Sequence, residues 1–406
     1  MGPLPGTGPY AQRVNGRYGA VRPSTWVVLA MVVLAAACVL SGLLPAQDAR
    51  AVGARTAPVL GFVVAITIVA ELARDASVFE VLAQLLGRWG RRRMVVLWVW
   101  VVLLAVVSTV FLSLDTTAVI LTPLVVLLAQ SIGISPLPFA LATIWLANTA
   151  SLFLPVSNLT NLLAAPAIGD HPSAFLALSW APAVVGVVVP VAILTLRYRG
   201  VLFSTYQVPP QRVPADPVLF WGAGLVLLVL LPLLAFTPHV WVPATAAAVV
   251  LAVLFLVRRR SALRPALVPW QALGIAGSLF VLVETAHAHG LAALLTAVTG
   301  AGHGPGELLR VAALGALAAN GINNLPAYLV LEPIAAGDPV VLMALLIGVN
   351  LGPLVTPWAS LATLLWHQRV VALGVTFPWR RFAAWGLVAA VPTVALAALA
   401  LAAVGG

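Results

Sequence analysis

The sequence predicts an all-α polytopic membrane protein built from two inverted repeats, each with a re-entrant hairpin and a broken transmembrane helix. Three observations predict this fold class. The 406-residue chain is 62% hydrophobic and 8% charged, and its mean hydropathy is +1.09. Two polar, proline-containing stretches lie 202 residues apart and resemble each other. Apolar runs of about 20 residues, the length of a transmembrane helix, recur along the chain with arginines in the short loops between them.

The chain begins with a Gly/Pro-rich tail, and the apolar run at 26–44 that follows is longer than a signal-peptide core. We therefore expect a retained first span. Further spans are expected at 58–73, 174–196, 218–236, 240–257, 270–286 and 382–403. These elements divide the chain into a cytoplasmic N-terminal tail (1–24), a first transmembrane repeat (25–199), a cytoplasmic linker (200–216) and a second transmembrane repeat (217–406).

The two similar stretches are NTASLFLPVSNLTNLL at 148–163 and NLGPLVTPWASLATLL at 350–365. They share Asn148 with Asn350, Pro155 with Pro357, and four leucines. The first stretch lies in an apolar region, 137–168, which would be about 48 Å long as one helix, whereas the hydrocarbon core is about 30 Å thick. The second lies in a similar region at 340–366. Both regions are therefore predicted to be broken helices.

Two other regions read as apolar helix pairs joined by a polar tip. The first tip is SLDTT at 113–117, and the second is NGINNLP at 320–326. We interpret both regions as re-entrant hairpins. Two crossing helices would leave the topology unchanged, because either arrangement returns the chain to the same side of the membrane.

All 21 basic residues are arginines, and their distribution predicts the topology. With nine spans, two hairpins and a cytoplasmic N-terminus, 18 arginines lie inside and only Arg50, Arg55 and Arg310 lie outside. The two hairpins then enter from opposite faces, which makes the halves inverted repeats. The net charge of +10 reports orientation in the membrane, so no nucleic-acid partner is expected.

Breaks and hairpin tips expose backbone groups that are tolerated at membrane depth only where they line a site. Asp115 is the strongest candidate, because a carboxylate in the membrane usually marks an ion or proton path. The expected substrate- or ion-binding residues are Asp115, Thr116, Asn148, Ser157, Asn158, Asn323, Asn324, Asn350, Thr356 and Ser360. The alternative is that these side chains satisfy freed backbone groups or hold helices together.

Glu71 and Glu284 occupy matching positions in the segments 60–73 and 273–286, and both are candidates for a proton relay. Placement at the membrane interface is the alternative for both. The single cysteine, Cys38, excludes an intrachain disulfide and a cysteine-cluster metal site. No metal and no cofactor are expected.

Four motifs in order resemble the ArsB-type arsenite and antimonite efflux permeases, which belong to an ion-transporter superfamily that includes divalent-anion/sodium symporters. They are SLDTTAVILTP at 113–123, NTASLFLPVSNLTNLL at 148–163, NNLPA at 323–327 and LGPLVTPWASLATLLW at 351–366. The resemblance implies proton-driven export of As(III) and Sb(III) across the inner or plasma membrane, in some members with a soluble ATPase partner. A homodimer is a further expected partnership. Leu114, Asn148 and Asn350 depart from the family pattern, which has Asn, Asp and an acidic residue there.

The sequence therefore predicts a secondary active transporter that works by alternating access, and not an enzyme. There is no HExxH motif, no GxSxG motif and no pair of intramembrane aspartates. Neutral arsenous acid presents three hydroxyls that Asn, Ser and Thr can bind. A sodium- or proton-coupled symporter of a carboxylate or another oxyanion is the alternative, because amide side chains at unwound helices also suit Na⁺.

Overall fold

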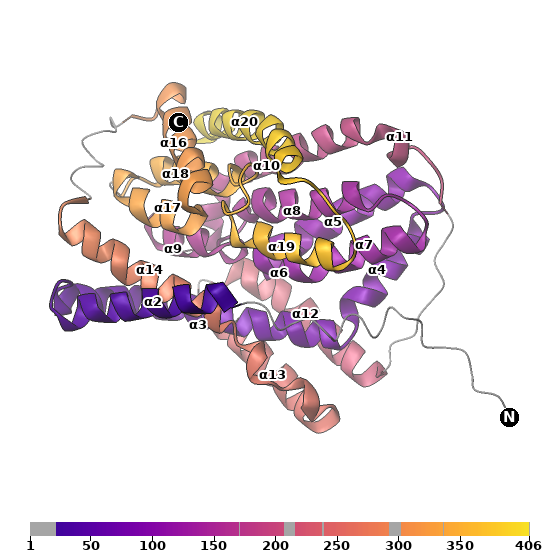
Figure 1. Ribbon diagram of the computed structural model, residues 1–406, viewed down its shortest axis with the longest axis horizontal. Helices are drawn as coiled ribbons and strands as arrows, with labels where there is room; N and C mark the ends of the chain where they lie inside the picture. Colours follow the sequence, from indigo (N-terminus) through magenta and orange to yellow (C-terminus); the bar gives the residue numbers. More distant parts are fainter. Residues whose placement is uncertain are drawn as a thin grey trace.

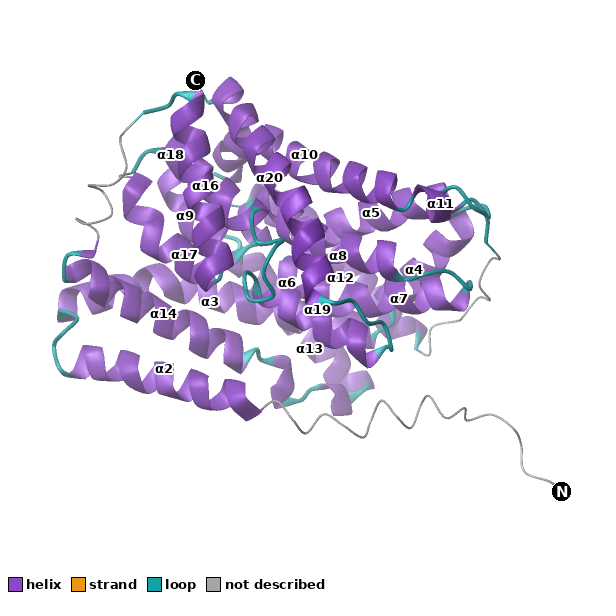
Figure 2. Ribbon diagram, turned by 45° about the horizontal axis from the view of Figure 1, so that its top comes forward, coloured by secondary structure: helices purple, strands orange, loops and turns teal. Residues whose placement is uncertain are grey.

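The computed structural model describes residues 22–169, 171–206, 216–237, 239–291, 302–335 and 337–405. This part of the chain is almost entirely helical (Figures 1 and 2), and eight of its helices are long and apolar enough to cross a membrane. The prediction of an all-α polytopic membrane protein is confirmed. Most of the predicted tail (1–24) lies outside the described residues, namely 1–21. The same is true of residues 207–215 of the predicted linker (200–216).

Five long helices form what we call the peripheral group. Their most extensive contacts join α3 to α13, α2 to α14, and α12 to α13. Figure 1 shows them together along the lower and left-hand side of the molecule. The group consists of α2 (Arg22–Leu40), α3 (Ala46–Asp75), α12 (Pro217–Phe236), α13 (Trp241–Arg258) and α14 (Trp270–Ala288), with the short helices η4 (Arg260–Ala262) and η5 (Pro265–Leu267).

The remaining helices form the central group, in which α16 packs on α18 and α10 packs on α20. In its first half, the helices are α4 (Val78–Trp89), α5 (Met94–Leu112), α6 (Leu114–Thr116), η1 (Thr117–Leu121), α7 (Thr122–Ser131), α8 (Leu137–Thr149), η2 (Ala150–Leu152), η3 (Pro155–Ser157), α9 (Leu159–Ile168), α10 (Pro172–Arg197) and α11 (Arg199–Leu202). In its second half, they are α16 (Pro305–Ile322), α17 (Asn324–Leu331), η6 (Glu332–Ala335), α18 (Pro339–Leu351), α19 (Leu361–Ala372) and α20 (Trp379–Val404).

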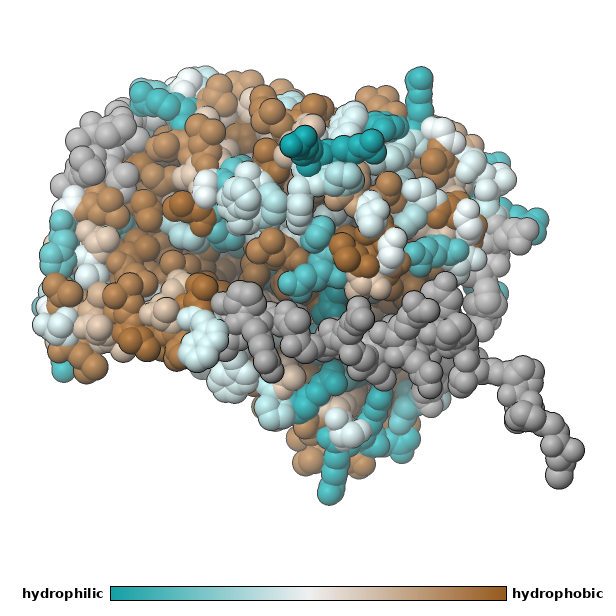
Figure 3. All heavy atoms as spheres, viewed as in Figure 1, coloured by the Kyte–Doolittle hydropathy of each residue, from teal (hydrophilic) through white to brown (hydrophobic). Residues whose placement is uncertain are grey.

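Helices α8 and α18 occupy the interior of the central group and are buried along nearly their whole length. Both are apolar all round, as expected for helices without a solvent face. Close packing of α18 on α16 depends on Gly348, because a Cβ at that position would lie 2.2 Å from the carbonyl oxygen of Ala312. Large apolar side chains remain exposed on the outer helices, and Figure 3 shows apolar residues spread over much of one face, as a lipid-facing surface requires.

Both predicted helix breaks are confirmed. Helix α8 ends at Thr149, two short 3₁₀ turns follow, and α9 begins at Leu159. In the second half, α18 ends at Leu351 and α19 begins at Leu361. Helices α18 and α19 thus begin 202 residues after α8 and α9, respectively, and the two pairs break at matching positions. The opposite orientation of the two halves in the membrane stays a prediction.

Three elements differ from the sequence-based expectations. Helix α3 begins at Ala46, before the expected start at Pro58, and this proline sits within the helix although it removes one backbone hydrogen bond. Helix α2 ends at Leu40, four residues before the expected end of the first span. The short helix α4 was not expected, because its apolar residues lie on one face and do not form a continuous run.

Candidate functional site

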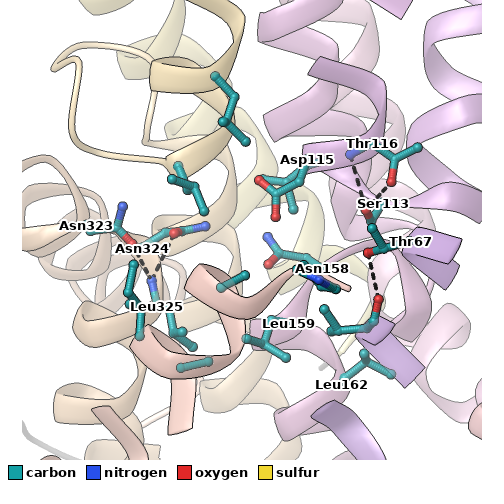
Figure 4. Close-up of a pocket in the computed structure, with 18 of the residues that line it drawn as sticks. Thr67, Ser113, Asp115, Thr116, Asn158, Leu159, Leu162, Asn323, Asn324 and Leu325 are labelled. Carbon is teal, nitrogen blue, oxygen red and sulfur yellow. Dashed lines mark hydrogen bonds between the residues drawn. The ribbon is translucent and has the colours of Figure 1, made fainter. Parts of the chain in front are cut away.

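A cavity of about 670 Å³ lies between the peripheral and central groups. Its peripheral wall is built by α2, α3 and α14 and is mostly apolar, with Ile66 and Leu279 among its residues and Thr67 and Glu71 on α3 as its polar side chains. Its central wall carries most of the polar side chains. Figure 4 shows Asp115 and Asn158 on one side of this space and Asn323 and Asn324 on the other. The polar lining residues are Thr67, Glu71, Ser113, Asp115, Thr116, Asn158, Asn323 and Asn324.

The tip between α5 and α7 places Asp115 at the cavity. The chain turns at Ser113, whose Oγ accepts a hydrogen bond from the backbone N–H of Thr116 at 3.4 Å and so caps the helix that follows. Behind the tip, Thr117 Oγ1 donates to Ser108 Oγ at 2.9 Å, and a π-helical turn follows at Thr117–Leu121. Oδ1 of Asp115 is buried without a hydrogen-bond partner among the described residues. An unpaired buried acceptor of this kind is available to a ligand.

The first break is held by a buried amide network that joins both halves of the chain. Asn350 Oδ1 accepts from Asn158 Nδ2 at 2.9 Å and from Thr160 Oγ1 at 2.8 Å. Asn350 Nδ2 donates to Asn161 Oδ1 at 2.7 Å, and Asn161 Nδ2 donates to the carbonyl oxygen of Ser151 at 2.7 Å. Freed backbone groups at the break are thus satisfied by side chains, as their depth in the protein requires.

The second break is organised by Asn320 on α16. Its Nδ2 donates to the carbonyl oxygen of Gly352 at 2.8 Å, and its Oδ1 accepts from the backbone N–H of Thr356 at 3.0 Å. Asn323 ties the adjacent tip to the same break, because its Nδ2 donates to the carbonyl oxygen of Trp358 at 2.8 Å. The second tip and the second break therefore form one hydrogen-bonded unit.

Five of the ten predicted binding residues line the cavity, together with Glu71. These five are Asp115, Thr116, Asn158, Asn323 and Asn324. The other five lie behind the cavity wall. Three of them donate a side-chain hydrogen bond to a backbone carbonyl oxygen: Ser157 to Val110, Thr356 to Asn320 and Asn148 to Ile144. Asn350 belongs to the amide network, and Ser360 is fully buried.

Glu284, the second residue predicted for a proton relay, lines a smaller, separate pocket. Among the described residues, no group of three or more His, Cys, Asp or Glu side chains is arranged to hold a metal ion. Sequence reasoning missed Thr67, Ser113 and Trp358 as cavity residues, and Asn320 as the organiser of the second break. An asparagine at the end of the apolar stretch 311–319 was the available signal for Asn320.

Comparisons with known proteins show the family of the chain. A protein-family model described as "Citrate transporter" matches residues 19–339. The arsenical pump membrane protein of Yersinia enterocolitica is 30% identical over 365 residues, which cover 83% of this chain and 85% of that protein. The arsenical pump membrane protein of Escherichia coli K12 is 31% identical with the same coverage. The chain is a member of the citrate transporter family and an ArsB-type ion transporter. It is thus a membrane transporter and not an enzyme.

The fold of this ArsB-type transporter has a solved counterpart. The YdaH transporter of Alcanivorax borkumensis, whose crystal structure revealed an unusual topology, superposes with a TM-score of 0.58 over 94% of this chain and 97% of that chain. The sequences are 17% identical, so the comparison concerns the fold alone.

Proposed function

We propose that this ArsB-type transporter exports arsenite and antimonite by alternating access, in exchange for protons. The observation that carries the proposal is the buried, unpartnered Oδ1 of Asp115 at a cavity whose polar wall is built by both hairpin tips and the first break. A carboxylate oxygen in such a place accepts either a proton or a hydroxyl hydrogen of the substrate, which is the competition that an exchanger requires.

The side chains beside Asp115 suit a small neutral hydroxylated solute. Arsenous acid presents three hydroxyls that donate and accept hydrogen bonds, and the amides of Asn158, Asn323 and Asn324 offer both donors and acceptors. The one cysteine, Cys38 on α2, is not among the residues that line the cavity. Hydrogen bonds in place of thiolate ligands would hold As(III) loosely enough for release on the other side.

The position of the cavity between two helix groups supports alternating access. The mostly apolar wall comes from the peripheral group, whereas both tips and both breaks belong to the central group. A movement of the central group along the apolar wall would carry the site from one side of the membrane to the other. Matching breaks in the two halves favour such a mechanism.

Arsenite accumulation in a host without its own arsenite exporter tests the proposal. We expect the wild-type chain to confer resistance and to lower cell-associated arsenic, and Asp115→Asn to lose at least about tenfold in export rate, as removal of an essential proton-transfer group does. Asp216→Asn is the matched control, because Asp216 pairs with Arg258 far from the cavity lining. Proton-driven uptake of arsenite into everted vesicles measures the coupling directly. Equal export by wild type and Asp115→Asn would contradict the role of Asp115.

A sodium- or proton-coupled symporter of a carboxylate or another oxyanion is the second candidate function. The family description "Citrate transporter" favours it, and a cavity of about 670 Å³ has room for an organic acid. Sodium-dependent citrate uptake by proteoliposomes, without arsenite transport in the same preparation, would support this function over the first. The soluble ATPase partner, the homodimer and the cytoplasmic N-terminus stay predictions.

A further inference from the structure

A second pocket of about 150 Å³ lies where α3, α14 and the end of α17 meet. It shares no lining residue with the large cavity among the residues described. Its lining includes four side chains that carry or can acquire charge, namely Arg55, Glu284, His287 and Glu332. Such a concentration of ionisable groups within apolar helices is expensive to maintain and usually serves a function.

Polar contacts in this pocket connect the peripheral group to the central group. Arg55, on peripheral helix α3, forms an ion pair with Glu332 in the central group. Nη2 of Arg55 also lies 3.5 Å from the carbonyl oxygen of Leu163, which belongs to α9 of the first break. Nε2 of His287, on peripheral helix α14, lies 3.3 Å from the carbonyl oxygen of Val330 on central helix α17. Sliding of the central group past the peripheral group would have to separate these contacts.

Arg55 has two carboxylates within this pocket, one on each helix group. Glu332 is its partner in the present structure, and the Oη–H of Tyr328 donates a second hydrogen bond to Glu332 at 2.9 Å. Glu284 is on α14, which packs against α3 within the peripheral group. A pair of Arg55 with Glu332 joins the two groups, whereas a pair of Arg55 with Glu284 lies entirely within one group.

We propose that this pocket is a proton-binding site. Protonation of Glu332 breaks its ion pair with Arg55, Arg55 then pairs with Glu284, and the central group is released from the peripheral group. A hydronium ion from the aqueous phase gives its proton to a carboxylate oxygen of Glu332. One O–H bond of the hydronium ion breaks, one O–H bond forms on Glu332, and a water molecule is left. The ion pair between Arg55 and Glu332, which joins the two helix groups, is then replaced by an ion pair between Arg55 and Glu284. The new pair lies within the peripheral group and does not restrain movement. The release of the central group rests on the alternating-access mechanism proposed above.

The charged and titratable groups around Glu332 are few. Helix α3 contributes Arg55, α14 contributes Glu284 and His287, and α17 contributes Tyr328. Among the described residues, helix α9 contains no charged residue, and α18, which packs on η6, has Asp338 at its N-terminal cap, where Asp338 pairs with His303.

Distance measurement between spin labels tests the proposal without any substrate. In a Cys38→Ser background, labels at Leu225→Cys on α12 and Leu317→Cys on α16 report the separation of the two groups, because both side chains are exposed on the outer surface. We expect one main distance at about pH 8 and a second, shifted distance that grows as the pH falls to about 4, the range in which carboxylates take up protons. Glu332→Gln, which mimics the protonated side chain, should show the shifted distance at both pH values.

Two further variants complete the test. Arg55→Gln removes the other partner and should give the same distribution as Glu332→Gln. Asp216→Asn breaks an ion pair that lies within the peripheral group and should behave like the parent. A Glu332→Gln distribution that keeps the parent's pH dependence would overturn the proposal. If the wild type transports no arsenite but still shows the pH-dependent distance, the proposed substrate fails while the proton site stands.

Discussion

Ser113 and Asn323 adopt the same rare backbone conformation, with φ of 88° and 92° and ψ of 160° and 152°. Each residue stands at a hairpin tip, and each caps the following helix by accepting a backbone N–H hydrogen bond on its side-chain oxygen. Non-glycine residues avoid this region because the Cβ atom crowds the backbone. The two halves therefore place the same strained turn at corresponding points of the cavity.

Glycine at position 323 should relieve the strain of this tip. We expect Asn323→Gly to be the less destabilising of two substitutions, because glycine adopts positive φ freely, although it loses the hydrogen bond from Nδ2 of Asn323 to the carbonyl oxygen of Trp358. Asn323→Val should destabilise the protein by about 1–3 kcal/mol, because a β-branched side chain fits positive φ poorly. Thermal unfolding of the purified variants in detergent measures both effects. Equal midpoints for the two variants would show that the turn is not strained.

The amide of Asn350 should be worth more to stability than that of Asn148, its counterpart in the first half. Asn350→Ala removes three side-chain hydrogen bonds. Asn158 Nδ2 keeps only its hydrogen bond to Ser151 Oγ at 3.4 Å, and Thr160 Oγ1 and Asn161 Oδ1 are left as unpaired polar atoms in a buried site. Each such atom costs about 1–3 kcal/mol. Asn148→Ala is the matched control, since among the described residues its one side-chain hydrogen bond goes to the carbonyl oxygen of Ile144 on its own helix.

Denaturant unfolding should give a clearly larger loss for Asn350→Ala than for Asn148→Ala. Similar losses would mean that the network joining the two halves contributes little. The double variant Asn158→Ala with Asn350→Ala should cost less than the sum of the single variants, because the two side chains share one hydrogen bond.

Hydropathy and proline placement were sufficient to predict the spans, both helix breaks and both polar tips. These features follow from local chemistry, because a run of apolar residues must be helical in lipid and a proline with polar neighbours interrupts the helix. Asp115 was predicted at a cavity for the same reason, since a carboxylate inside an apolar run needs a polar environment.

The separation of cavity residues from buried network residues was not predictable in this way. Asn158 lines the cavity and Asn350 does not, although both are polar residues next to a break. The difference depends on which face of each half meets the other half, and that is set by packing between residues that are far apart in the sequence. The pairing of Arg55 with Glu332 was not predictable for the same reason, because these two residues are also far apart in the sequence.

Packing of α16 against α18 should not tolerate a side chain at Gly348. A Cβ there would lie 2.2 Å from the carbonyl oxygen of Ala312 and 2.9 Å from the backbone nitrogen of Ala316, so the two helices would have to move apart. We expect Gly348→Ala to destabilise the protein by at least about 1–3 kcal/mol, the usual cost of overpacking.

Gly61→Ala is the control for this substitution. Gly61 lies within helix α3, and a Cβ at its position would meet nothing within 4 Å. We expect Gly61→Ala to be neutral or to stabilise the helix by about 0.5–1 kcal/mol. Thermal unfolding of both variants, with the amount of folded protein recovered in detergent, checks the contrast. A tolerated Gly348→Ala would show that the two helices can separate without loss.

Asp338 should make stability depend on pH in acid. It caps α18 by accepting backbone N–H hydrogen bonds from Val340 at 2.8 Å and Val341 at 3.1 Å, and it pairs with His303. Partial burial acts to raise the pKa of Asp338, but the hydrogen bonds from His303 and from the two backbone N–H groups outweigh it, so the pKa lies below the ordinary value.

A carboxyl group whose pKa is lower in the folded state stabilises the fold fully above its unfolded pKa, which is about 3.9 for aspartate. That contribution is lost as the pH falls through the folded pKa. We therefore expect Asp338→Ala to lower stability by about 1 kcal/mol at neutral pH, the usual value of a helix cap. Asp338→Asn should keep part of the cap while flattening the decline in acid. Unfolding midpoints measured from about pH 7 to about pH 3 test both effects, and an unchanged acid decline in Asp338→Asn would assign that decline to another carboxylate.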